Sequence, residues 1–191
     1  MDTIRAIQSR RSVRKYKDKK PDWRDILEAI NSAQYTPMAG DVFTLKFIVI
    51  DKLKTMQEIA KFSEQEFIQD AKYAVAFVSN PKKTKILYKE RGERYLKQQA
   101  GAAIQNFMLH LTNLGLSTCW IGHFNDEKIK KLLKIPETNE VEAIITIGYE
   151  KFKPKLKKEK GNIDKILYFN EWDNKRMDEI KKVEGRGPGW Y

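Results

Sequence analysis

The chain lacks the cysteines and the long apolar runs that mark several classes of protein. Cys119 is the single cysteine among 191 residues, which excludes an internal disulfide framework and a cysteine-based zinc cluster. The densest apolar stretches, such as Phe47–Ile50 and Ala143–Ile147, are as long as strands and too short to cross a membrane. Charges run through Met1–Arg11, so no apolar signal-peptide core is present there. We therefore expect no membrane segment and a reducing, cytoplasmic location.

Positive charge exceeds negative charge along the chain. Lysine and arginine number 37 against 26 aspartates and glutamates, giving a net charge of +11. Such a balance fits nucleic-acid binding, a local phosphate site for a small ligand, or a lysine-rich solvated surface. The basic residues are scattered and mixed with acids, as in Asp126–Lys131 and Lys175–Lys182. This mixing favours the solvated surface.

Hydrophobic periodicity predicts a mixed α and β protein with about four strands. Hydrophobic residues make up 41% of the chain, enough for a core. After Tyr149 the sequence turns basic and polar, which predicts a core of residues 1–150 and a C-terminal arm of residues 151–191 that lies on a second copy of the chain. The pattern predicts helices over Thr3–Ser9, Asp22–Ala33, Thr55–Phe62, about Tyr88 to Leu114, Asp126–Leu133 and Asn170–Val183, and strands over Leu45–Asp51, Ala74–Ser79, Ser117–Ile121 and Glu140–Tyr149.

A basic segment after the first predicted helix is a candidate anion site. Three arginines and two hydroxyls lie within Ser9–Arg14. In an extended segment alternate side chains point the same way, so Arg10, Ser12 and Arg14 can converge on one phosphate. The alternative is a solvated basic turn.

Three further segments are candidates for ligand contact. Pro37–Asp41 joins a helix to a strand, and the alternative is a plain loop. Ala100–Ala103 is unusually small for a helix interior, which favours close approach of another helix. Gly115–Gly122 ends in a glycine where a flat ligand can approach the backbone, and the alternative is a buried strand with a turn.

In their order and spacing these segments resemble the nitroreductase family of FMN-dependent oxidoreductases. The resemblance extends from about Thr3 to Leu167. The matching motifs are Arg10–Arg14, Pro37–Asp41, Ala100–Asn106, Gly115–Gly122, Leu133–Pro136 and Ile147–Tyr149.

The resemblance implies an α+β, nitroreductase-like fold with FMN at a homodimer interface. That fold has a central, mostly antiparallel sheet flanked by helices, a long dimer-interface helix and an extended C-terminal arm around the partner. Arg10, Ser12 and Arg14 would bind the FMN phosphate and ribityl chain, with the Arg11 backbone nearby, and Lys158 or Lys160 would complete the phosphate site. The isoalloxazine ring would meet two parts of the dimer. One is a loop from the partner subunit, formed by Pro37, Met38, Ala39, Gly40 and Asp41. The other is the end of the short strand, formed by Trp120, Ile121 and Gly122.

The activity implied by the resemblance is a two-step exchange. NAD(P)H delivers hydride to flavin N5, and a nitroaromatic, quinone or similar acceptor then takes the electrons. The flavin carries this chemistry, so neither a catalytic side chain nor a metal is expected.

Several positions depart from the family pattern and leave alternatives open. Asp41 replaces an asparagine, Phe43 a glutamine, Thr44-Leu45 the usual Pro-Trp, and Gln99 an acid. The alternatives are a flavin-binding sensor, a divergent flavoenzyme with another substrate, and a basic nucleic-acid-binding domain. The aromatic residues lie on apolar stripes, which disfavours the nucleic-acid alternative.

Overall fold

The structure, a computed structural model, describes residues 2–152 and 161–177. Contacts within the chain divide it into two units, Met1–Lys153 and Pro154–Tyr191, and each is described by itself.

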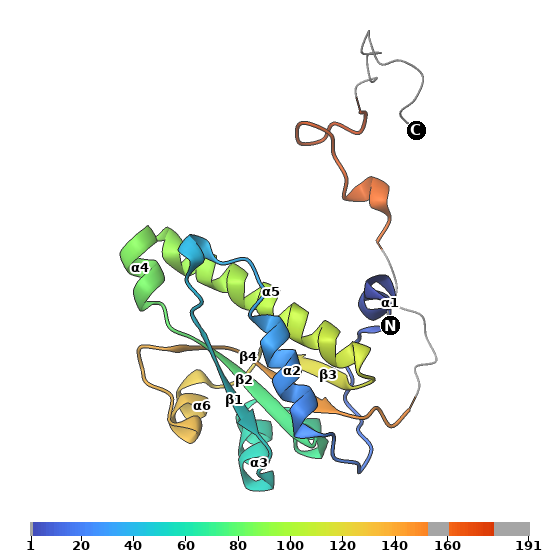
Figure 1. Ribbon diagram of the computed structural model, residues 1–191, viewed down its shortest axis with the longest axis vertical. Coiled ribbons are helices and arrows are strands. Elements are labelled where there is room, and N and C mark those ends of the chain that lie inside the picture. Colours follow the sequence, from blue (N-terminus) through green and yellow to red (C-terminus); the bar gives the residue numbers. More distant parts are fainter. Residues whose placement is uncertain (1, 153–160, 178–191) are drawn as a thin grey trace. The chain divides into compact units, whose positions relative to one another are not determined.

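A four-stranded antiparallel sheet forms the centre of the first unit (Figure 1). Its order is β1-β2-β4-β3, so the third strand in sequence lies at one edge. Every residue of β2 is buried because both faces of the sheet are covered. The strands are β1 (Leu45–Ile50), β2 (Tyr73–Ser79), β3 (Ser117–Ile121) and β4 (Glu140–Gly148).

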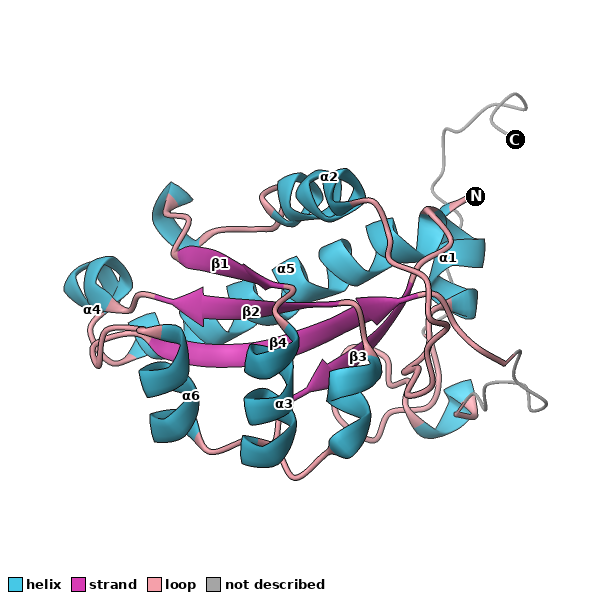
Figure 2. Ribbon diagram, turned by 90° about the horizontal axis from the view of Figure 1, so that it is seen from below, coloured by secondary structure: helices cyan, strands magenta, loops and turns pink. Residues whose placement is uncertain are grey.

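Helices cover both faces of this sheet, as Figure 2 shows. The helices are α1 (Thr3–Ser9), α2 (Trp23–Ala33), α3 (Leu53–Phe62), α4 (Lys82–Tyr88), α5 (Arg91–Asn113) and α6 (Asp126–Leu133). On one face α2 and α5 pack against Phe77 and Ile145, and on the other α3 and α6 pack against Ala76 and Ile144. Two apolar clusters therefore hold the sheet between helical layers, which is an α+β arrangement.

Local signals explain several element boundaries. The Asp22 carboxylate accepts a hydrogen bond from Arg24 N at the start of α2, as an N-cap residue does. Gly115 follows α5 with a φ of 80°, which confirms the predicted helix end. The predicted bounds of Thr3–Ser9 and Ser117–Ile121 are those of α1 and β3.

The predicted long helix is interrupted near its start. Lys89 has a φ of 51° and separates α4 from α5. A Cβ atom at Gly92 would lie 2.3 Å from the Thr84 carbonyl oxygen. Only glycine therefore allows the first turn of α5 to pack this closely against α4. The single helix expected from Tyr88 is therefore wrong at this end.

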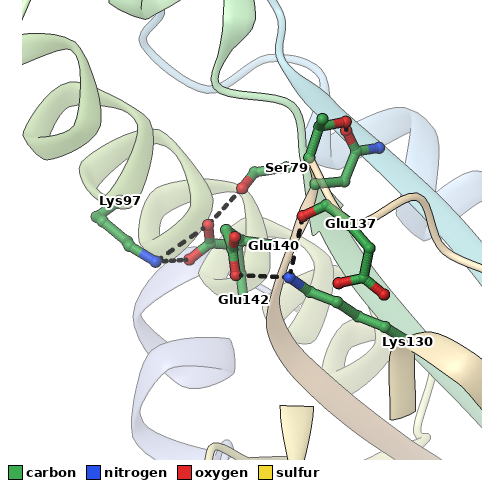
Figure 3. A network of polar contacts seen from close by, with 8 residues as sticks. Ser79, Lys97, Lys130, Glu137, Glu140 and Glu142 are labelled. Carbon is green, nitrogen blue, oxygen red and sulfur yellow. Dashed lines mark hydrogen bonds and ion pairs between the residues drawn. The ribbon is translucent and has the colours of Figure 1, made fainter. Parts of the chain in front are cut away.

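A polar network occupies the end of the sheet where β2 stops and β4 begins (Figure 3). The Glu142 carboxylate accepts from the Ser79 hydroxyl and lies 3.2 Å from Lys97 Nζ on α5. Lys130 Nζ on α6 lies 3.2 Å from a Glu140 carboxylate oxygen. These contacts tie both helical layers to β4.

The described part of the second unit, residues 161–177, is largely irregular. It contains a 3-10 turn at Ile163–Lys165, and the Tyr168 and Trp172 rings contact each other at 4.7 Å. The helix predicted from Asn170 is wrong as far as Met177, and its remainder lies outside the described residues.

No helix in the described parts of the chain has both the length and the apolar character needed to cross a bilayer.

Candidate functional site

The basic segment after α1 runs beside β3 and the end of β4. Ser12 forms a parallel bridge with Thr118, and Val13 N donates to the Thr118 carbonyl at 2.9 Å. Further on, Lys17 N donates to the Tyr149 carbonyl at 2.8 Å. The segment is therefore held extended along the sheet by backbone hydrogen bonds.

Tyr16 anchors this segment in the core. Its hydroxyl lies 2.7 Å from the Val13 carbonyl and 2.8 Å from Thr146 Oγ1. Its ring packs on Gly148, where a Cβ atom would lie 2.7 Å from the ring. Burial raises the pKa of Tyr16 above its ordinary value, so the hydroxyl stays neutral and keeps both contacts.

Arg10, Ser12 and Arg14 each influence the pKa of the Cys119 thiol on β3. Burial raises the pKa of that thiol, while the positive charges of Arg14 and Arg10 and a hydrogen bond with Ser12 act in the opposite direction. The Cys119 thiol on β3 thus senses all three residues that are predicted to bind the phosphate. This neighbourhood has the cationic forks and the neutral donor that suit a phosphate dianion.

A hollow of about 140 Å³ lies beside the segment after α1 and is lined by Arg10, Arg11, Val13 and Thr118 among others, but not by Ser12 or Arg14. The Thr118 hydroxyl is buried and has no hydrogen-bond partner within the described ranges. A buried hydroxyl without a partner is costly. Together with the arginines it fits a ligand that presents phosphate and hydroxyl oxygens, as the chain of FMN does.

Arg11 also lines this hollow. Its guanidinium makes a two-point contact with the Glu150 carboxylate, with Nε 3.1 Å from Oε1. This contact engages the Arg11 side chain, so its backbone is the part left for a ligand.

Phe67 is a neighbour of the site that sequence reasoning missed. The Arg14 guanidinium lies 5.8 Å from the centre of its ring. Phe67 belongs to the 3-10 turn Glu66–Asp70, and nothing in the local sequence singles it out.

The end of β3 presents its residues to different sides. Trp120 pairs with Ile145 on the α5 face and is 39% exposed. Ile121 is buried on the opposite face, whereas Gly122 is exposed. A flat ligand here would meet the Trp120 side chain and the backbone of Ile121 and Gly122.

The loop Pro37–Asp41 lies toward the N-terminal end of α5 (Figure 1), whereas α1 lies beside its C-terminal half. A Cβ atom at Gly40 would lie 2.7 Å from the Tyr88 hydroxyl and 3.5 Å from Leu87 of α4, and the φ values are 61° at Gly40 and 55° at Asp41. Within one chain the loop is therefore not brought to the segment after α1, whereas Trp120 lies on β3, the strand with which that segment pairs.

Gln99 of α5 holds the chain just after this loop. It is buried, its Oε1 accepts from Thr44 N at 3.1 Å and from the Thr44 hydroxyl, and its Nε2 donates to the Val42 carbonyl at 3.1 Å. Gln99, which stands where the family has an acid, thus holds the backbone of Val42 and Thr44 in place.

Lys158 and Lys160 lie outside the described residues. Within the described ranges, no group of three or more histidine, cysteine, aspartate or glutamate side chains is arranged to hold a metal ion.

The nitroreductase family model matches residues 7–69 and 55–149 of the chain. A relative from Archaeoglobus fulgidus, named as an NADH dehydrogenase/NAD(P)H nitroreductase, is 29% identical over 157 residues, covering 78% of this chain and 86% of its own.

Solved structures of the nitroreductase family have a fold similar to that of this chain. A nitroreductase family protein from Clostridium novyi NT is 28% identical, with a TM-score of 0.74 over 91% of this chain and 96% of its own. An FMN-dependent nitroreductase from Clostridium difficile R20291 is 25% identical, with a TM-score of 0.76 over 88% of this chain and 99% of its own. The predicted α+β, nitroreductase-like fold is confirmed.

Proposed function

Because the chain belongs to the nitroreductase family, we propose that it is an NAD(P)H-dependent FMN oxidoreductase that reduces a nitroaromatic, quinone or similar small acceptor. The A. fulgidus and C. difficile relatives carry the corresponding names. When bound, FMN supplies the hydride and electron chemistry, and the protein supplies binding and orientation.

One observation carries the proposal: the segment that contains Arg10, Ser12 and Arg14 is held extended beside the edge strand β3, with Ser12 bridged to Thr118. Arg10 and Arg14 would neutralise the FMN phosphate, Ser12 would donate to it, and the unpartnered Thr118 hydroxyl would bond an oxygen of the ribityl chain. Backbone pairing with Thr118 and Tyr149 fixes the segment before the ligand arrives. Such preorganisation lowers the cost of binding.

The ring end of the proposed site needs a second subunit. The exposed Trp120 would cover one part of the ring, but Pro37–Asp41 lies toward the far end of α5 in the same chain. From Gln99 to Thr112 the helix rises by about 20 Å. In a homodimer whose α5 helices pack together, the loop of one protomer would reach the arginine site of its partner.

The exposed face of α5 supports this pairing. Gly101 and Ala102 are partly exposed, and a Cβ atom at Gly101 would meet no atom of the chain within 4 Å. Small residues on such a face allow two helix backbones to approach closely.

The test begins with the absorption spectrum of the purified protein and identification of the released chromophore. Titration with NADH and NADPH under nitrogen follows. We expect a yellow protein that contains FMN, is bleached by one or both nucleotides and is recoloured by a quinone or nitroaromatic. FMN that no nucleotide bleaches would instead favour a sensor, and failure to take up FMN would contradict the proposal.

Two arginine variants test the phosphate contact directly. Arg14→Gln should weaken FMN binding about tenfold or more, since a hydrogen bond to a charged group contributes about 1.5–3 kcal/mol. Arg24→Gln removes the same charge from an exposed position on α2 and should leave FMN binding unchanged. Equal affinities of the two variants would exclude Arg14 from the site.

A further inference from the structure

A second cluster of cations lies beyond the arginine site, where the segment after Arg14 pairs with the end of β4. Lys151 N donates to the Lys15 carbonyl at 2.9 Å, and Tyr16 is bridged to Glu150. In this antiparallel register Lys15 stands opposite Lys151.

The register brings three lysines together at the end of this two-stranded ribbon. Lys15 and Lys17 flank the buried Tyr16 along the chain, and Lys151 lies opposite Lys15, so the three lysines are close neighbours at this end of the ribbon. All three are exposed, and none has an ion-pair partner among residues 2–152 and 161–177. Like charges opposite each other destabilise a strand pair, and a bound anion would relieve that repulsion.

These lysines line one hollow of about 620 Å³ together with Lys72 and Phe152. Two acids also line it. Asp18 is paired with Lys72, which lowers the pKa of Asp18 through a hydrogen bond and its charge, while Asp70 opposes an anion. The four lysines outnumber the two acids, so the lining carries net positive charge.

Phe152 gives the hollow a second chemical character. Its ring is 60% exposed, and Lys151 Nζ lies 5.7 Å from the ring centre. An exposed aromatic face beside cations suits a ligand that combines a planar base with phosphates. The volume is in the range of small-molecule sites, about 300–1,000 Å³.

We propose that this hollow is a nucleotide site separate from the flavin site, and that it binds a nucleoside diphosphate group. Its phosphates would contact Lys15, Lys151 and Lys72, and its base would stack on Phe152. Arg10, Ser12 and Arg14 do not line this hollow. The same chemistry is present in free ADP and in the adenine half of a nicotinamide dinucleotide.

Isothermal titration calorimetry of the full-length protein with ADP, pyrophosphate, adenosine and ADP-ribose tests the proposal. We expect ADP to bind once per chain, pyrophosphate to bind more weakly and adenosine not to bind detectably. ADP-ribose that binds as tightly as ADP would identify the dinucleotide half as the source, and ADP binding without ADP-ribose binding would identify the free nucleotide.

Three variants distinguish specific binding of ADP in this hollow from nonspecific attraction to a basic surface. Lys15→Gln with Lys151→Gln should weaken ADP binding about tenfold or more, because each lysine makes a charge-assisted contact. Phe152→Leu should weaken binding of ADP and leave that of pyrophosphate unchanged. The control, Lys46→Gln with Lys131→Gln, removes the same charge from exposed positions on β1 and α6 and should change affinity by less than about twofold.

Three results would overturn the proposal. They are equal weakening in the control pair, loss of ADP binding when FMN is added, and tighter binding of a single-stranded oligonucleotide than of ADP. The first indicates diffuse charge, the second indicates the flavin phosphate site, and the third indicates a nucleic-acid surface.

Discussion

Asp41 combines an unusual backbone with a charge at the proposed ring contact. Its φ of 55° follows one of 61° at Gly40, so two consecutive residues are left-handed. Asparagine and aspartate tolerate this conformation better than other non-glycine residues. The family's asparagine and this aspartate therefore suit the same loop geometry and differ in charge.

Asp41→Asn should raise the reduction potential of bound FMN. An ionised carboxylate beside the ring opposes the negative charge gained on reduction, so removing it favours the reduced form. We expect a shift of about 30 mV or more, since 30 mV corresponds to about 1.4 kcal/mol for two electrons. Anaerobic titration against a reference dye measures the potential. Glu127→Gln on α6 is the charge-matched control, and an unchanged potential in Asp41→Asn would reject this role.

At the scale of elements, one buried amide joins α5 to the chain after the loop. Gln99→Ala would leave the Thr44 N–H and the Val42 carbonyl without their partners. We expect the free energy of unfolding to fall by about 2–4 kcal/mol, because each buried unpaired group costs about 1–3 kcal/mol. Denaturant unfolding measures this change. Gln98→Ala, one residue earlier and exposed, should alter stability by less than about 0.5 kcal/mol, and equal values for the two variants would contradict this role of Gln99.

The elements show which features could be predicted from sequence. Capping at Asp22, the glycine after α5 and the apolar runs of the strands act locally, so those elements were predictable. The break at Lys89 was not, because it depends on the close contact of Gly92 with Thr84 across two helices. The helical period from Asn170 was misleading, since Tyr168 and Trp172 contact each other within an irregular turn instead.

The same distinction holds for the candidate site. The extended backbone that alternation along Arg10–Arg14 requires is present, whereas the convergence of these side chains on one ligand stays a prediction. The contact of Phe67 with Arg14 joins residues far apart in sequence and follows from packing of the turn Glu66–Asp70 near the sheet. The role of Gln99 was also out of reach, since its partners are set by how α5 crosses the start of β1.

At the scale of the whole molecule, the proposed site is divided between the two ends of α5. Arg10–Arg14 and Trp120 form one half, and Pro37–Asp41 forms the other. One chain does not join them, whereas a second copy packed on Gly101 would. Cofactor binding and dimer formation are therefore coupled in this proposal, since each complete site needs both copies.

Gly101→Leu tests that coupling. A Cβ atom at Gly101 meets no atom of its own chain, and leucine has a higher helix propensity than glycine, so the protomer should fold at least as stably as before. The larger side chain would keep two α5 helices apart, and we expect a shift from dimer to monomer together with loss of bound FMN. Analytical ultracentrifugation and flavin absorbance measure the two effects. Lys61→Leu, at an exposed position on α3 across the sheet, should change neither. A variant that remains a flavin-loaded dimer would show that the subunits pair through another face, and a wild-type monomer that holds FMN would show that one chain builds the site alone.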